Sequence, residues 1–141
     1  MSPKYAISAV VCALLLASCG DDDGDDGPGP DTTEPVPGAG GTITPTDIIP
    51  TGVTLNWTAA TDDVTVAGNL RYRVYQSSSA NIGTPEDAAA NGTVILDWWY
   101  DTTSHTVGSL TPTTTYHFNV VVMDEAGNAA AYQQMSVFTV D

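Results

Sequence analysis

The chain has 141 residues and a formal net charge of −14, and seven of its 17 acidic residues fall within residues 21–34. Its three basic residues cannot form the positive surface that follows a phosphate backbone, so nucleic acid is excluded as a partner. Both cysteines, Cys12 and Cys19, precede residue 42. The region after them has no disulfide and depends on packing alone, in a length that suits one domain.

Residues 1–18 have the features of a bacterial secretory signal, with Lys4 followed by an apolar stretch at residues 6–17. This stretch is shorter than the about 20 residues that a membrane-spanning helix needs. At its end, Leu-Ala-Ser-Cys at residues 16–19 resembles the lipobox of bacterial lipoproteins. The resemblance implies cleavage before Cys19 and a lipid anchor in the membrane on that residue. A plain secreted protein with a coincidental cysteine is the alternative.

Residues 19–41 are predicted to be a disordered linker, acidic at first and then rich in Pro, Gly and Thr. The acidic run directly after Cys19 resembles the surface-export signals of Bacteroidetes-type lipoproteins, although a solvated spacer explains it equally well. We therefore expect the protein in the bacterial cell envelope, lipid-anchored at the outer membrane or the cell surface.

The first part of the region 42–141 alternates apolar and polar residues, which predicts β-strands. Residues 43–47 form a candidate edge strand, since Pro45 has no backbone N–H to donate. Residues 53–58 predict a strand with Trp57 in the core, and residues 70–75 predict one with Tyr72 and Val74 in the core. The outer face of this third strand is then expected to carry three residues: Arg71, Arg73 and Tyr75.

A short helix is predicted near residues 85–91, because Thr84 can cap its N-terminus and Pro85 suits the first helical position. The strand predicted for residues 94–100 should place Trp98 inside and Trp99 outside. A further short strand follows around His105, where alternation places the imidazole on an inward, partly buried position.

The stretch 110–123 predicts a strand with a strongly apolar face. Residues 124–128 form a hairpin turn in which Gly127 can adopt a positive φ. The final strand spans residues 132–140, and its register is open, because Phe138 and Val140 compete with Met135 and Val137 for the inward face.

These short strands, with turns between them, indicate a β-sandwich. Trp57, Tyr72-x-Val74 and the spaced pattern Leu-x-Pro-x-x-x-Tyr-x-Phe-x-Val at residues 110–120 resemble the signature of fibronectin type III domains. The turn Asp-x-Ala-Gly-Asn at residues 124–128 is common in bacterial members. The resemblance covers residues 42–141. The expected core residues are Trp57, Tyr72, Val74, Trp98, Leu110, Tyr116, Phe118 and Val120.

The resemblance implies an all-β, seven-stranded immunoglobulin-like sandwich of a three-stranded and a four-stranded sheet. Tyr116 becomes the tyrosine corner, whose hydroxyl bonds to the backbone a few residues upstream. Residues 77–104 depart from the family pattern by their length, their helix and their Trp-Trp-Tyr cluster. A function peculiar to this protein is therefore expected in that segment.

No catalytic residue is predicted. The chain lacks the nucleophile elbow and the phosphate-binding glycine loop, and the region after residue 41 has no cysteine. A non-catalytic protein-interaction or spacer module is the first hypothesis, with an unidentified partner and a monomeric state. Its contact surface would be the outer face of the four-stranded sheet, which is expected to carry Arg71, Arg73, Tyr75, His117, Asn119, Val121 and Met123.

Two other binding modes stay open. Exposed aromatic side chains can stack on sugar rings, so Trp99 with Tyr75 or Tyr100 forms a candidate carbohydrate platform, although core packing explains part of the same cluster. No cofactor is expected except Ca²⁺, for which one pole of the sandwich offers oxygen ligands. These candidate ligands are Asp62, Asp63, Asp124, Glu125 and Asn128, all residue types that turns also favour.

Overall fold

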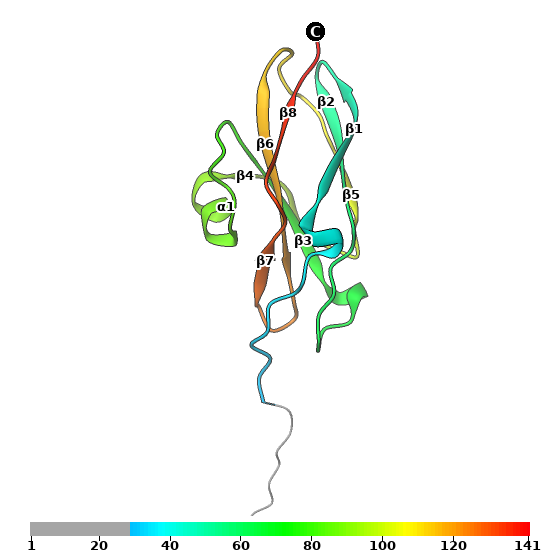
Figure 1. Cartoon of the computed structure of the whole chain (residues 1–141), viewed down its shortest axis with the longest axis vertical. Helices are drawn as coiled ribbons and strands as arrows, with labels where there is room; N and C mark the ends of the chain where they lie inside the picture. The colour runs from blue at the N-terminus through cyan, green and yellow to red at the C-terminus, as the bar shows by residue number, and fades with distance from the viewer. Residues whose placement is uncertain (1–28) are drawn as a thin grey trace, which may run out of the picture.

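The computed structural model describes residues 29–141, so the signal, Cys19 and the acidic run at residues 21–26 lie outside the described part. Two β-sheets pack face to face (Figure 1). The elements are η1 (Gly38–Gly41), β1 (Ile43–Ile49), β2 (Gly52–Trp57), η2 (Ala67–Asn69), β3 (Arg71–Ser77), α1 (Pro85–Asn91), β4 (Thr93–Tyr100), β5 (Ser104–Val107), β6 (Thr115–Met123), β7 (Ala129–Ala131) and β8 (Met135–Phe138). The predicted all-β sandwich with one short helix is confirmed.

One sheet has the strand order β1-β2-β5, and the other has the order β4-β3-β6, with β7 and β8 both paired to β6. β7 and β8 pair with successive parts of β6, so the larger sheet has five strands, one more than predicted. β8 lies within the predicted final strand at residues 132–140, whereas β7 precedes it. The register of the final strand is now settled: Val137 is buried, whereas Phe138 and Val140 are exposed. The edge strand β1 runs to Ile49, two residues beyond the prediction.

Three aromatic rings hold the two sheets together. Tyr72 lies 6.0 Å from Trp57 and 6.5 Å from Tyr132, measured between ring centroids. The hydroxyls of both tyrosines are satisfied at the edge of the core: the Ala60 N–H donates to Tyr72 at 2.9 Å, and Tyr132 donates to the Thr58 carbonyl at 2.6 Å. Burial raises the pKa of both hydroxyls, so they stay protonated.

The tyrosine corner is present. The N–H of Thr111 donates to the Tyr116 hydroxyl at 3.0 Å. Hydrogen bonding with Thr111, first through its side chain and then through its backbone, lowers the pKa of Tyr116. The bond fixes the chain where it enters β6. Leu110, Phe118 and Val120 on either side of the corner are buried as predicted, and Tyr116 packs against them partly exposed.

Trp98 is the one expected core residue that the structure moves out of the main core. Strand β4 shifts its register against β3 twice, once between Tyr72 and Val74 and again between Val74 and Tyr75. Such bulges break the two-residue period on which the prediction rested. As a result Trp99 is paired with Tyr72, and Trp98 packs against a second, smaller apolar cluster.

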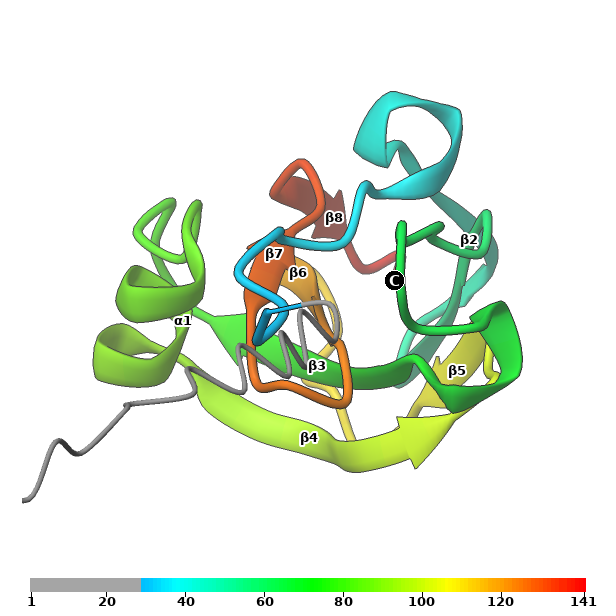
Figure 2. The same ribbon diagram turned by 90° about the horizontal axis from the view of Figure 1, so that it is seen from below.

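Helix α1 lies on the outer side of the larger sheet (Figure 2), and its Ala88 belongs to this second cluster. The cluster contains Tyr75, Ile82, Ala88 and Val121. The helix forms as predicted, with the Thr84 side chain accepting from the Asp87 N–H at 3.1 Å and Pro at the first turn. The helix packs against Tyr75 and Val121, which the sequence places on a solvent-exposed face.

Residues 29–41, assigned to the linker by composition, contact the domain. Val36 and Thr61 exchange backbone hydrogen bonds of 2.7 and 3.0 Å, and Gln133 donates to the Gly40 carbonyl at 2.7 Å. Gly38 lies so close to the β2–β3 loop that a Cβ would stand 2.3 Å from the Ala59 carbonyl oxygen. The structured unit therefore extends upstream of the predicted boundary at residue 42. Within residues 29–141, none of the helices has the length and apolar character required to cross a membrane.

Replacing Tyr72 with Phe should destabilise the domain by about 1–3 kcal/mol, because the buried Ala60 N–H loses its acceptor. Urea denaturation followed by tryptophan fluorescence measures the change. Tyr100→Phe, on an exposed side chain, is the matched control and should stay within about 0.5 kcal/mol of the wild type. Equal midpoints for the two variants would show that the Tyr72 hydroxyl does not hold the loop.

Candidate functional site

The outer face of the larger sheet carries a stack of two arginines on Trp98. The guanidinium carbon of Arg73 lies 4.3 Å from the centroid of the Trp98 ring, and that of Arg71 lies 5.8 Å from it. Both distances are within the range of a cation–π interaction. Arg73 also forms the one salt bridge within the described residues, with Asp97.

Asp97 connects Arg73 to the backbone of the irregular strand β4 by hydrogen bonds. Its Oδ1 accepts from the Trp98 N–H at 2.8 Å and from Arg73 Nε at 2.9 Å. The hydrogen bond from Trp98, followed by that from Arg73, lowers the pKa of the Asp97 carboxyl. The two arginines predicted to contact a partner are thus already engaged with side chains of their own sheet.

Other residues of the predicted contact face are covered. Tyr75 is 4% exposed beneath α1, so its assignment as an exposed aromatic is wrong. Asn119 is also buried, and its Nδ2 donates to the Ile82 carbonyl at 2.6 Å. His117 is partly exposed and pairs with Ser77 and Ser136 across the neighbouring strands. The segment between β3 and α1 folds back over this face and removes much of it from solvent.

Trp99 and Tyr100 are the prominent exposed aromatics of β4, with 64% and 57% of their surfaces accessible. They point to opposite faces of the strand. Trp99 is opposite Tyr72 of the core, while Tyr100 is opposite Arg71 of the outer stack. The predicted platform of Trp99 with Tyr75 or Tyr100 is therefore wrong, and Trp99 stands alone on its face.

A hollow of about 260 Å³ lies between β4 and β5, with Trp99 and Leu96 on one side and Thr102, Ser104 and His105 lining the rest. An indole face beside hydroxyl groups and an imidazole is a combination that can hold a polar ring. His105 is partly buried, as predicted, and this burial lowers its pKa despite a hydrogen bond with the Ile95 backbone.

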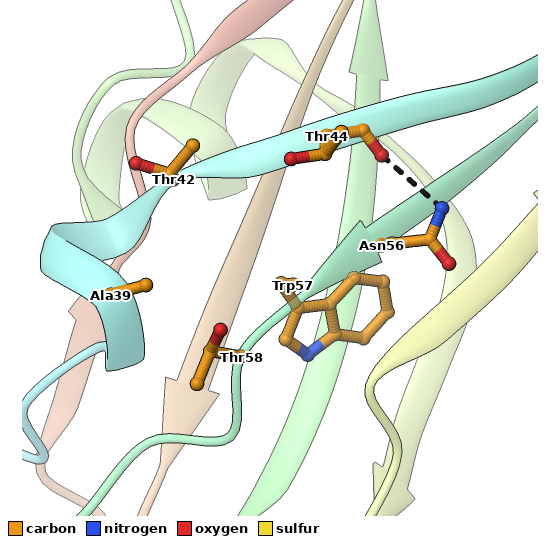
Figure 3. Close-up of a pocket in the computed structure, with 6 residues that line it drawn as sticks. All are labelled: Ala39, Thr42, Thr44, Asn56, Trp57 and Thr58. Atoms are coloured by element: carbon orange, nitrogen blue, oxygen red, sulfur yellow. Dashed lines mark hydrogen bonds between the residues drawn. The ribbon is translucent and has the colours of Figure 1, made fainter.

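A second hollow, of about 230 Å³, lies beside η1 and is lined by Ala39, Thr42, Thr44, Asn56, Trp57 and Thr58 (Figure 3). Asn56 Nδ2 donates to the Thr44 carbonyl at 3.3 Å along one wall. The Trp57 indole Nε1 is buried and has no hydrogen-bond partner.

Three carboxylates meet at the pole where the N-terminal segment enters. One oxygen from each of Asp31, Asp62 and Asp124 lies within 4.8 Å of the others. At that separation two unit charges repel by about 3 kcal/mol with an effective dielectric constant of about 20. Neither described arginine forms a salt bridge with this group.

The structure brings two residues of the predicted acidic pole together. Asp62 and Asp124 come together, whereas Asp63 and Glu125 are exposed and outside the cluster. Asn128 is adjacent, since its Nδ2 donates to Asp124 Oδ2 at 2.7 Å. Asp31 was missed, because a lone aspartate in a linker-like segment carries no periodicity that would place it on the domain.

Comparison with known proteins agrees with the sandwich. The model of the fibronectin type III domain matches residues 37–138. The chain belongs to the fibronectin type III family. Among solved structures, the fibronectin type III domain of the human KIAA0970 protein superimposes with a TM-score of 0.55 at 19% identity, over 77% of this chain and 74% of that one. A domain of human fibronectin type III domain containing protein 3 gives 0.54 at 15% identity, over 77% and 85%.

Curated relatives of this fibronectin type III chain are bacterial enzymes. Chitinase Chi52 of Paenibacillus xylanexedens is 38% identical over 130 residues, which are 92% of this chain and 21% of that protein. Chitinase D of Niallia circulans is 38% identical over 113 residues, 79% of this chain and 18% of the enzyme. Exoglucanase B of Cellulomonas fimi is 36% identical over 105 residues, 72% and 7% respectively. The chain thus spans about a fifth or less of each relative.

The fibronectin type III domain should lose stability as the pH falls below about 6.5, because the lowered pKa of His105 lets the unfolded state bind a proton first. Urea midpoints of the wild type and of His105→Gln, measured between about pH 7.5 and 5.5, test this. The Gln variant should have a shallower pH dependence. Identical slopes would show that burial of this imidazole does not contribute.

Proposed function

We propose that the protein is a non-catalytic fibronectin type III module that is tethered to the bacterial envelope through a lipidated Cys19 and binds a partner outside the membrane. The matched region makes up about a fifth or less of the length of two chitinases and an exoglucanase. This small share supports the role of an accessory module. Its two histidines lie on different sheets, His105 on β5 and His117 on β6.

The envelope location is supported by two independent features. The lipobox-like sequence ends the apolar stretch at the position where a lipoprotein signal is cleaved. Chitinases and exoglucanases act on polymers that are too large to enter a cell, so a module shared with them suits an extracellular place.

The observation that carries the binding proposal is the isolated exposure of Trp99. An indole with 64% of its surface in solvent is available to a partner, and tryptophan dominates the binding energy of many interfaces. A protein partner is the first candidate, as for many modules of this fold. Carbohydrate is the second, favoured by the hydroxyl groups of Thr102 and Ser104 in the hollow beside this ring.

The anchor is tested by Cys19→Ser in the full chain expressed in a bacterial host. The wild type should incorporate a labelled fatty acid and sediment with membranes, because two or more acyl chains hold stably in a bilayer. The Ser variant should incorporate no label and leave the membrane fraction. Labelled Cys19→Ser protein, or an unlabelled wild type, would contradict the anchor.

Binding through Trp99 is tested by comparing Trp99→Ala with Phe138→Ala, which removes an aromatic of similar exposure (59%) from β8. Each form is used to capture proteins from intact cells and is applied to a glycan array. Loss of Trp99 should weaken binding by about tenfold or more, since truncating a hot-spot tryptophan commonly costs about 2 kcal/mol or more.

The two readouts distinguish the partners. Array signals that fall with Trp99→Ala and compete with free sugar indicate carbohydrate, whereas a captured protein that is lost in the same variant indicates a protein partner. Equal losses for Trp99→Ala and Phe138→Ala would show that the captured material adheres to any exposed aromatic.

A further inference from the structure

The three carboxylates at the N-terminal pole come from separate parts of the chain. Asp62 lies in the loop after β2, Asp124 begins the β6–β7 hairpin, and Asp31 belongs to the segment that precedes η1. Local hydrogen bonds hold each one in place: Asp62 Oδ2 accepts from the Thr65 N–H at 2.8 Å, and Asp124 Oδ1 accepts from the Asn128 N–H at 2.8 Å. The group is therefore built before any ligand arrives.

Two oxygens of this group have no partner. Oδ2 of Asp31 and Oδ1 of Asp62 each expose less than 1 Å² to solvent and accept no hydrogen bond. The other oxygen of each carboxylate is the one used locally, by Thr33 N–H on Asp31 and by Val64 and Thr65 N–H on Asp62. Asp124, the third member, is wholly buried. A buried carboxylate oxygen is costly unless a donor or a cation satisfies it.

We propose that Asp31, Asp62 and Asp124 form a calcium site that fastens the N-terminal segment to the pole of the sandwich. Calcium prefers carboxylate and carbonyl oxygens and accepts irregular geometry with six to eight ligands, whereas magnesium demands a small octahedral cage. The Asp31 carbonyl already points into this pole, where it accepts from Asn128 Nδ2 at 3.2 Å. Waters complete the coordination on the exposed side.

The site links the tether to the domain. Asp31 is the ligand that the N-terminal segment contributes. The part of this segment that follows Asp31 is held by the Val36–Thr61 bridge. Without calcium the repulsion among the three carboxylates opposes this docking, and with calcium the same charges favour it. The inference does not depend on the lipid anchor or on a partner at Trp99.

Calorimetric titration and thermal unfolding of the full chain with CaCl₂ test the site. Extracellular calcium modules bind on the order of 10⁻⁴ M. Calcium at about 10 mM should then raise the melting temperature by about 10 °C. The aspartates at residues 21–26 are present in every variant, so their weak binding cancels in the comparison.

Asp62→Asn and Asp31→Asn keep an acceptor for the local hydrogen bonds and remove one charge each. Both should lose at least tenfold in calcium affinity. In EDTA each should melt above the wild type, because repulsion is relieved, and in calcium each should melt below it. Asp63→Asn, with the same charge change one residue away, should stay within about twofold of the wild type.

Hydrogen exchange reports the docking directly. Calcium should slow exchange at the Val36 N–H, which bonds to the Thr61 carbonyl, in the wild type but not in Asp31→Asn. The proposal is overturned if calcium leaves the wild-type melting temperature unchanged, if Asp62→Asn binds as the wild type does, or if Asp63→Asn loses as much affinity as Asp62→Asn.

Discussion

The buried contact of Tyr72 with Trp57 and Tyr132 is the constraint on which the rest of the sandwich depends. The three rings come from both sheets and from the link between β7 and β8. A large aromatic core gives a domain without disulfides much of its apolar burial, but it also buries two hydroxyls. Both are satisfied by the backbone of the loop after β2, at Thr58 and Ala60. The core thereby fixes the start of the loop that presents Asp62.

The position of β4 at the edge of the larger sheet explains why this strand is irregular. As the outermost strand of the larger sheet it has one unpaired edge, and bulges at such edges discourage pairing with another chain. The two register shifts turn Trp98 onto the outer face, where Arg73 covers it, and leave Trp99 beside the hollow next to His105. One irregularity thus protects an edge and creates the most exposed aromatic of the strand.

Much of the fold is readable from the sequence because β2 pairs with β5 and β3 with β6 in unbroken register, and because Tyr116 and its upstream turn act locally. The site is less readable. Bulges invert the faces of Trp98 and Trp99 without changing composition, and α1 buries Tyr75 through a contact between segments that no periodicity reports. Asp31 joins Asp62 and Asp124 only after the chain has folded, across 93 residues of sequence (31 to 124).

The two ends of the described chain leave the sandwich at opposite poles (Figure 1). The N-terminal segment enters beside the β6–β7 hairpin, and the C-terminus lies at the far end. A mechanical pull between them runs along the strands, so it loads the β1–β2 and β6–β8 ladders in shear, with many hydrogen bonds sharing the force at once. A topology with both ends at one pole would let the strands peel apart bond by bond. The sandwich is therefore oriented to withstand traction along its long axis.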